Sequence, residues 1–183
     1  MTPPTVRLRP AEPRDEESVL ALAARLAEFG PVGDRTASEI VGAERAALGA
    51  AFAHLPDGAA LLVADAGDGA VVGFVFVETR VDYFTGAPHG HVGILAVAAE
   101  AEGLGVGRAL LGAAEAWAAE CGFTHLTLTV FEPNVRARRV YERFGFAPEL
   151  ITYRKRLTER TPRRHPGETY GGDDAPRGGV HAR

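Results

Sequence analysis

The segment LAVAAEAEGLGVGRALL, residues 95–111, decides how the rest of the chain is interpreted. An apolar run is followed by three glycines at alternate positions and then by an apolar pattern with helical spacing. Glycines at the first turn of a helix let backbone N–H groups converge on one point without obstruction from Cβ atoms. Because a helix start also carries partial positive charge, the segment predicts a site for a phosphate group.

Two familiar phosphate loops do not fit this spacing. Gly103, Gly105 and Gly107 lack the final glycine of a dinucleotide fingerprint, and no Lys followed by Ser or Thr completes a Walker loop. A domain that binds nucleotide phosphates is therefore disfavoured.

Helices and strands are expected to alternate on both sides of this segment. The predicted strands are residues 5–9, 61–65, 71–79, 91–97, 126–130 and 151–157, and the predicted helices are residues 13–29, 38–54, 106–121 and 135–144. A glycine turn after residue 65 predicts a hairpin, and strands separated by helices imply at least one parallel crossover. Gly93 inside its strand predicts a bulge or a close approach of another group. The fold class is therefore mixed α/β with a mixed sheet.

Composition narrows the classes of function. The 183 residues include 20 basic and 24 acidic side chains, a net charge of −4 that offers no overall positive field for nucleic acid or an anionic membrane. A single cysteine, Cys121, excludes an internal disulfide and a multi-thiolate metal site. No apolar run approaches the roughly 18 residues of a membrane span. We expect a soluble cytoplasmic protein. Of the 20 basic residues, only Lys155 is a lysine and the rest are arginines, a bias typical of a GC-rich bacterium.

The C-terminal residues differ from the rest in composition. Residues 159–183 contain five Gly and three Pro but only four apolar side chains, too few to offset the entropy of ordering. We expect one domain over residues 1–158 and a disordered polar tail over residues 159–183.

A second motif follows the predicted strand at 126–130. Asn134, Ala137, Tyr141, Gly145 and Phe146 have the spacing of a pattern found in one enzyme superfamily. Together with the glycines, this motif resembles the GNAT superfamily of N-acetyltransferases, over about residues 5–157 in element order. The resemblance implies a mostly antiparallel sheet with a central parallel strand pair and helices on both faces.

The resemblance also implies how the donor, acetyl-CoA, is held as a co-substrate without a metal. Residues 102–107 match the family's R/Q-x-x-G-x-G/A turn, which binds the CoA pyrophosphate, but Glu102 stands where Arg or Gln is usual. A carboxylate there is electrostatically unfavourable, and Arg108 is placed to supply positive charge. The implied donor-binding residues are Leu95, Ala96, Val97, Glu102, Gly103, Leu104, Gly105, Val106, Gly107, Arg108, Asn134 and Tyr141.

The implied reaction is direct attack of a primary amine, from a small molecule or peptide, on the acetyl group in a ternary complex. Tyr141 would act as general acid at the sulfur, or else be a core aromatic. Asn134 would bind the pantetheine arm, cap its helix, or do both. A non-catalytic acyl-CoA sensor is the alternative function.

The general base is less well indicated. The candidates are His91, His89, Glu78 and Asp82, and deprotonation through water is also open. His91 ranks first because it shares strand parity with Gly93, Leu95 and Val97 and because histidine titrates near neutrality. A metal pair formed by His89 and His91 lacks a third ligand.

The acceptor is expected over the first two predicted helices and the segment after the second hairpin strand. In that segment Asp82, Tyr83, Phe84 and His89 could hold an ammonium group and its carbon body, or the aromatic pair could form an apolar plug in the hairpin loop. The acidic net charge favours a cationic amine. Because relatives are often dimers, a homodimer is compatible with the resemblance.

Overall fold

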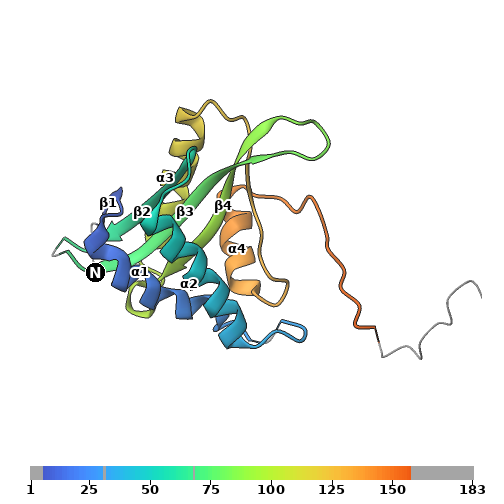
Figure 1. Ribbon diagram of the computed structural model, residues 1–183, viewed down its shortest axis with the longest axis horizontal. Coiled ribbons are helices and arrows are strands. Elements are labelled where there is room, and N and C mark those ends of the chain that lie inside the picture. Colours follow the sequence, from blue (N-terminus) through green and yellow to red (C-terminus); the bar gives the residue numbers. More distant parts are fainter. Residues whose placement is uncertain (1–5, 31, 68, 158–183) are drawn as a thin grey trace, which may run out of the picture. The chain divides into compact units, whose positions relative to one another are not determined.

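The computed structural model describes residues 6–30, 32–67 and 69–157 (Figure 1). The chain divides into two units, residues 1–147 and 148–183. Every helix and strand of the described residues belongs to the first unit. In the second unit, residues 148–157 adopt neither helix nor strand.

Five strands form one sheet in the order β1-β2-β3-β4-β5. They are β1 (Arg7–Pro10), β2 (Ala59–Asp65), β3 (Val71–Val81), β4 (Pro88–Val97) and β5 (Leu126–Leu128). Neighbours from β1 to β4 are antiparallel, whereas β4 and β5 are parallel. The predicted fold class, the hairpin and the parallel pair are thereby confirmed, but the pair is not central, because β5 is at the edge of the described sheet.

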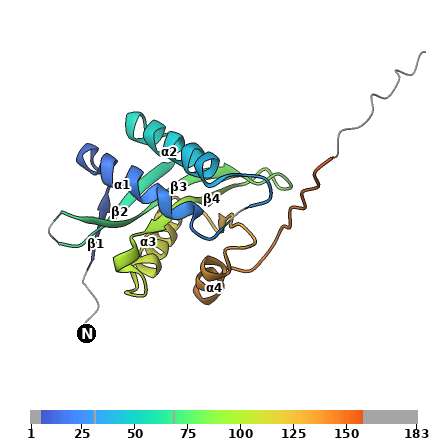
Figure 2. The same cartoon turned by 90° about the horizontal axis from the view of Figure 1, so that it is seen from below.

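Helices cover both faces of the sheet, with α1 and α2 on one face and α3 and α4 on the other (Figure 2). Their bounds are α1 (Glu16–Leu22), α2 (Ala37–Ala53), α3 (Val106–Glu120) and α4 (Val135–Phe144), joined by the 3-10 helices η1 (Pro13–Asp15), η2 (Ala23–Ala27) and η3 (Ala99–Ala101). Each face buries its own apolar cluster: Phe74 and Ile94 pack with Val19 and Leu48, and Val75, Val77 and Val92 pack with Val106 and Leu110. Among the described residues, no helix has the length and apolar content needed to cross a bilayer.

Two predicted elements differ from the structure. The helix expected over residues 13–29 is divided, because its last turns tighten to 3-10 geometry before Gly30, whose φ is +107°. The strand expected over residues 151–157 is absent, since alternation marks a candidate strand but only pairing with a neighbour satisfies its backbone. The predicted tail, residues 159–183, lies entirely outside the described part of the chain.

Gly93 is the extra residue of a bulge in β4, as its position in an apolar strand predicts. Phe76 pairs with Ile94 and Val77 pairs with Val92, so Gly93 has no partner on β3. A Cβ atom on Gly93 would lie 3.1 Å from Cδ1 of Phe76, which leaves little room for a larger residue. Because of this extra residue, the alternation of side chains between the two faces of the sheet is out of step by one residue on the two sides of Gly93.

A charged triad ties β1 to the hairpin of β2 and β3. Arg9 donates through both terminal nitrogens to Asp15, at 2.6 and 2.9 Å, and through Nε to Asp65 at 3.2 Å. Asp15 also accepts from the Glu12 N–H, and Asp65 accepts from the Gly67 N–H. Asp15 is buried, and both of its carboxylate oxygens accept hydrogen bonds, which is the condition for a buried ion to be stable.

We predict that Arg9→Met lowers the melting temperature on the order of 5–10 °C, because it leaves two carboxylates without a counter-charge. In the folded protein the pKa of Asp15 is lowered, chiefly by its hydrogen bond from Arg9, and the pKa of Asp65 is lowered, chiefly by the Gly67 N–H. Their contribution to stability is therefore present above the unfolded carboxyl pKa, about 3.9, and lost as pH falls through the lower folded values. Thermal unfolding of both proteins from pH 7 to pH 3 checks this. An unchanged melting temperature at pH 7 would contradict it.

Candidate functional site

A cleft opens where β4 and β5 part. The two strands pair only at three positions, residues 90–92 with residues 126–128, although β4 continues to Val97. Residues 92–97 and 128–131 then form facing walls of a cavity of about 700 Å³. The two strands therefore diverge, which leaves the β5-facing edge of β4 open beyond the bulge.

The glycine turn, residues 102–107, forms one end of the cavity. Gly103 and Gly105 have φ values of +74° and +85°, a left-handed conformation that favours glycine. Gly105 is the residue that precedes α3, and no side chain caps that helix start. The first N–H groups of α3 therefore have no acceptor within the helix, which is the arrangement that binds anions.

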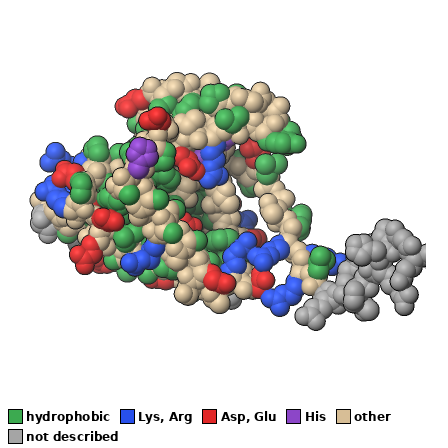
Figure 3. All heavy atoms as spheres, in the orientation of Figure 1, with side chains coloured by type: hydrophobic (Ala, Val, Ile, Leu, Met, Phe, Trp, Pro, Cys, Tyr) green, Lys and Arg blue, Asp and Glu red, His purple; other side chains and the backbone are tan. Residues whose placement is uncertain are grey.

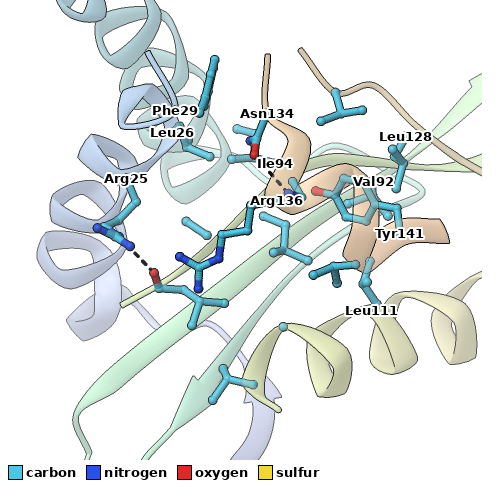
Figure 4. Close-up of a pocket in the computed structure, with 18 of the residues that line it drawn as sticks. Arg25, Leu26, Phe29, Val92, Ile94, Leu111, Leu128, Asn134, Arg136 and Tyr141 are labelled. Atoms are coloured by element: carbon cyan, nitrogen blue, oxygen red, sulfur yellow. Dashed lines mark hydrogen bonds between the residues drawn. The ribbon is translucent and has the colours of Figure 1, made fainter. Parts of the chain in front are cut away.

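Glu102 is neutralised in the structure by two arginines from distant parts of the chain. Its carboxylate binds Arg25 of η2 and Arg136 of α4 (Figure 4). The hydrogen bond from Arg136 is the main cause of a lowered pKa at Glu102. Arg25 also donates to the carbonyl of Val97 at 3.3 Å. Arg25 also pairs with Glu28, so these two arginines and two acids carry no net charge, and the unfavourable charge expected from Glu102 alone is neutralised.

Tyr141 and Asn134 line the cavity from α4 and its leading edge. Tyr141 extends from α4 into the cavity that Val92 and Ile94 of β4 also line (Figure 4). Burial raises the pKa of this phenol, so it remains protonated through the neutral range. Asn134 accepts a hydrogen bond from the Ala137 N–H at 3.1 Å, so it caps α4 while facing the cavity.

Most of the predicted donor-binding residues line this one cavity. They are Leu95, Ala96, Val97, Glu102, Gly103, Gly105, Val106, Gly107, Arg108, Asn134 and Tyr141. Leu104 does not line it. Arg108 lies over the ring of Phe144, 5.8 Å from its centroid, so its guanidinium extends toward α4.

His91 is placed differently from the expectation. Its expected parity with Leu95 and Val97 is wrong, because the bulge at Gly93 inserts one residue between them. His91 is buried, does not line the cavity, and lies 2.8 Å through Nδ1 from Oγ1 of Thr127. Burial lowers its pKa to about 4, which makes it neutral at pH 7 and a weak base.

The four predicted acceptor-binding residues also lie outside the cavity lining. Asp82 accepts hydrogen bonds from Phe84 and Thr85 N–H groups and so stabilises the turn between β3 and β4. Tyr83 is 91% exposed and packs edge-on against Phe84. His89 lies on β4 opposite Arg80. Within the described residues, no group of three or more metal-ligating side chains gathers.

Several residues that line the cavity belong to neither sequence motif. Leu26, Phe29 and Glu44 come from the face of the sheet that carries α1 and α2, and Phe131 follows β5. The sequence could have indicated Glu44, because it lies four residues after Ile40 and four before Leu48, within the buried stripe of α2. A carboxylate at an inward position of an amphipathic helix indicates a polar cavity.

Figure 3 shows acidic and basic side chains both scattered over the face seen in Figure 1, so this face carries no uniform field of either sign. Three acids line the cavity, and two of them, Glu28 and Glu102, pair with arginines. Four arginines gather toward the glycine turn and α4, namely Arg25, Arg108, Arg136 and Arg143. The site therefore has a cationic end suited to phosphates.

Comparison with known proteins gives curated relatives and solved structures. An aminoglycoside N(6′)-acetyltransferase type 1 from Stenotrophomonas maltophilia is 37% identical over 98 residues, 51% of this chain and 64% of that protein. A mycothiol acetyltransferase from Propionibacterium freudenreichii is 43% identical over 91 residues, 50% of this chain and 28% of that protein. The chain thus spans less than two thirds of either relative.

A solved structure shares the fold. It is an aminoglycoside N-acetyltransferase, AAC(6′)-Iy, in complex with CoA, which aligns with a TM-score of 0.63 and 23% identity over 83% of this chain and 95% of its own. The Acetyltransferase (GNAT) family matches residues 26–146, a range that contains the glycine turn, the open strand edge and Tyr141. The chain belongs to the GNAT family of acetyltransferases.

Proposed function

We propose that the protein transfers an acetyl group from acetyl-CoA to a primary amine of a small molecule or peptide. The observation that carries this is the parting of β4 and β5 beside the glycine turn, which provides an open strand edge, an anion site and a phenol in one cavity. The two curated relatives, named as an aminoglycoside N(6′)-acetyltransferase and a mycothiol acetyltransferase, support a small-molecule acceptor.

The residues present fit the donor. The N–H groups at the start of α3, with Arg25 and Arg136 beside them, suit a pyrophosphate, and the open edge of β4 beyond Gly93 suits a pantetheine arm. Acetyl-CoA supplies an activated thioester. The backbone of Leu95 and Val97 orients it, and apolar neighbours such as Val92 and Leu128 exclude water from it.

The chemical step follows from these positions. The neutral amine nitrogen attacks the carbonyl carbon, a C–N bond forms, the C–S bond breaks, and the sulfur leaves as a thiolate. Tyr141 donates its phenolic proton to that sulfur, and the excess proton on the new amide nitrogen returns to Tyr141 through solvent. Because the phenol stays protonated well above neutral pH, it can serve as this acid at any physiological pH.

We predict that Tyr141→Phe lowers kcat on the order of 10²-fold, because it removes the acid but retains the ring. CoA affinity is expected to stay within about twofold, since the lost hydroxyl acts only on the leaving sulfur. Stopped thiol-release assays and calorimetry with CoA check the two quantities. Unchanged turnover would remove Tyr141 from the proposed role.

We predict that Arg136→Gln weakens CoA binding about threefold to tenfold at low salt and less at high salt, because it removes an exposed charge beside the phosphates. Arg138→Gln is the matched control, since Arg138 lies on the same helix, pairs with Glu132 and does not line the cavity. Calorimetry at two ionic strengths measures both. An equal loss of CoA affinity in the two variants would contradict the prediction and show that only the overall charge of the protein affects CoA binding.

The decisive experiment is acetyl-CoA consumption across a panel of diamines, amino sugars, amino acids and short peptides, with products identified by mass spectrometry. An N-acetylated product that disappears with Tyr141→Phe supports the proposal. CoA binding without transfer to any amine would favour an acyl-CoA sensor instead.

A further inference from the structure

The cavity contains a carboxylate that the donor does not need. Glu44 lines it from α2 and is half-buried. Two other acids line the same cavity, and both are paired: Glu28 with Arg25, and Glu102 with Arg25 and Arg136. Among the residues that the structure describes, Glu44 has no ion-pair partner of its own.

The helix places this carboxylate inward. Ile40 and Leu48, one turn to either side, are 6% and 0% exposed, so the stem of Glu44 continues the buried stripe. Burial alone raises the pKa of Glu44. A partly desolvated carboxylate without a counter-ion is stabilised by a cation that enters the cavity.

The position of Glu44 relative to the reacting groups matters as well. Tyr141, the proposed acid, reaches the cavity from α4 on one face of the sheet, whereas α2 packs on the other face. The amine must approach the carbonyl from a side that the sulfur and its acid do not occupy. The gap between β4 and β5 gives that approach, so the side that carries Glu44 is the side open to the acceptor.

The surroundings of Glu44 in the cavity suit a carbon body. Leu26 and Phe29 line this side, and Phe29 packs against Phe131 with ring centroids 5.4 Å apart. Arg35 lies over the Phe131 ring, 6.0 Å from its centroid. An apolar wall with one open carboxylate recognises a hydrocarbon chain that ends in an ammonium group.

Resting on the function proposed above, we propose that Glu44 is the specificity-determining residue of the acceptor subsite and that the acceptor carries a second positively charged group, which pairs with Glu44 while its neutral primary amine attacks the acetyl group. The acceptor class is therefore a diamine or another polycationic amine. Asp82 and its neighbours in the hairpin turn have no part in this subsite.

Three amines of equal length test the pairing: 1,4-diaminobutane, 4-aminobutan-1-ol and 4-aminobutanoate, whose far ends are cationic, neutral and anionic. With the full chain saturated with CoA, calorimetry should show 1,4-diaminobutane binding about tenfold more tightly than 4-aminobutan-1-ol, and 4-aminobutanoate most weakly. In acetyl transfer the same order should appear in KM, with similar kcat for the first two.

Two variants of one residue separate charge from structure. Glu44→Gln should abolish the preference between 1,4-diaminobutane and 4-aminobutan-1-ol, and Glu44→Lys should reverse the order in favour of 4-aminobutanoate. Glu120→Gln, an exposed residue of α3 that does not line the cavity, is the control and should keep the wild-type order. A preference that survives in Glu44→Gln, or that falls equally in Glu120→Gln, overturns the proposal. So does a fall in kcat shared by all the amines without a change in KM.

The same amine titrations on the protein without CoA keep the two proposals apart. A protein that fails to bind CoA refutes the proposed function. The response of amine binding to Glu44→Gln then still tests the subsite.

Discussion

The early end of the pairing between β4 and β5 is the constraint on which the site depends. Three residue pairs hold the two parallel strands together, and then the sheet opens. The bulge at Gly93 lies at this point, where a side chain would meet the ring of Phe76. If pairing continued, the strand edge, the cavity and the space in front of Tyr141 would all be closed. A defect in the hydrogen-bond ladder is thus the structural basis of the site.

Charge in the cavity is organised around this opening. Glu102, unusual at its position in the glycine turn, links η2 to α4 through Arg25 and Arg136. Glu28 offsets the second of these arginine charges, and Arg108 and Arg143 then give this end of the cavity, near the uncapped start of α3, an excess of positive charge. Glu44 on α2 has no ion-pair partner among the described residues. The two ends of one cavity therefore favour ligands of opposite charge, as a reaction between an anionic donor and a cationic acceptor requires.

Much of this arrangement could be predicted from sequence, because it depends on local patterns. Glycines at alternate positions and an Asn with a Tyr seven residues later marked two sets of residues that line the cavity, and apolar and alternating runs predicted all five strands to within about three residues at each end. The parity of His91 could not be predicted, since it depends on which residue of β4 lacks a partner. The pairing of Glu102 with Arg25 joins residues 77 positions apart, which no local pattern encodes. The expected strand at 151–157 failed for the same reason, because strand formation depends on a partner.

The helix that carries Tyr141 has an unusual local stability. α4 is ten residues long, shorter than the roughly 12–15 residues at which an isolated helix becomes even marginal in water, and none of its residues is fully buried. It is attached through a one-sided apolar face, its Asn134 cap and the Arg136 link. Such a segment opens more readily than the sheet beneath it, so its amide hydrogens exchange with solvent early. A molecule that fills the cavity adds contacts to α4 when it is closed, and binding therefore couples directly to the order of the helix that supplies the acid.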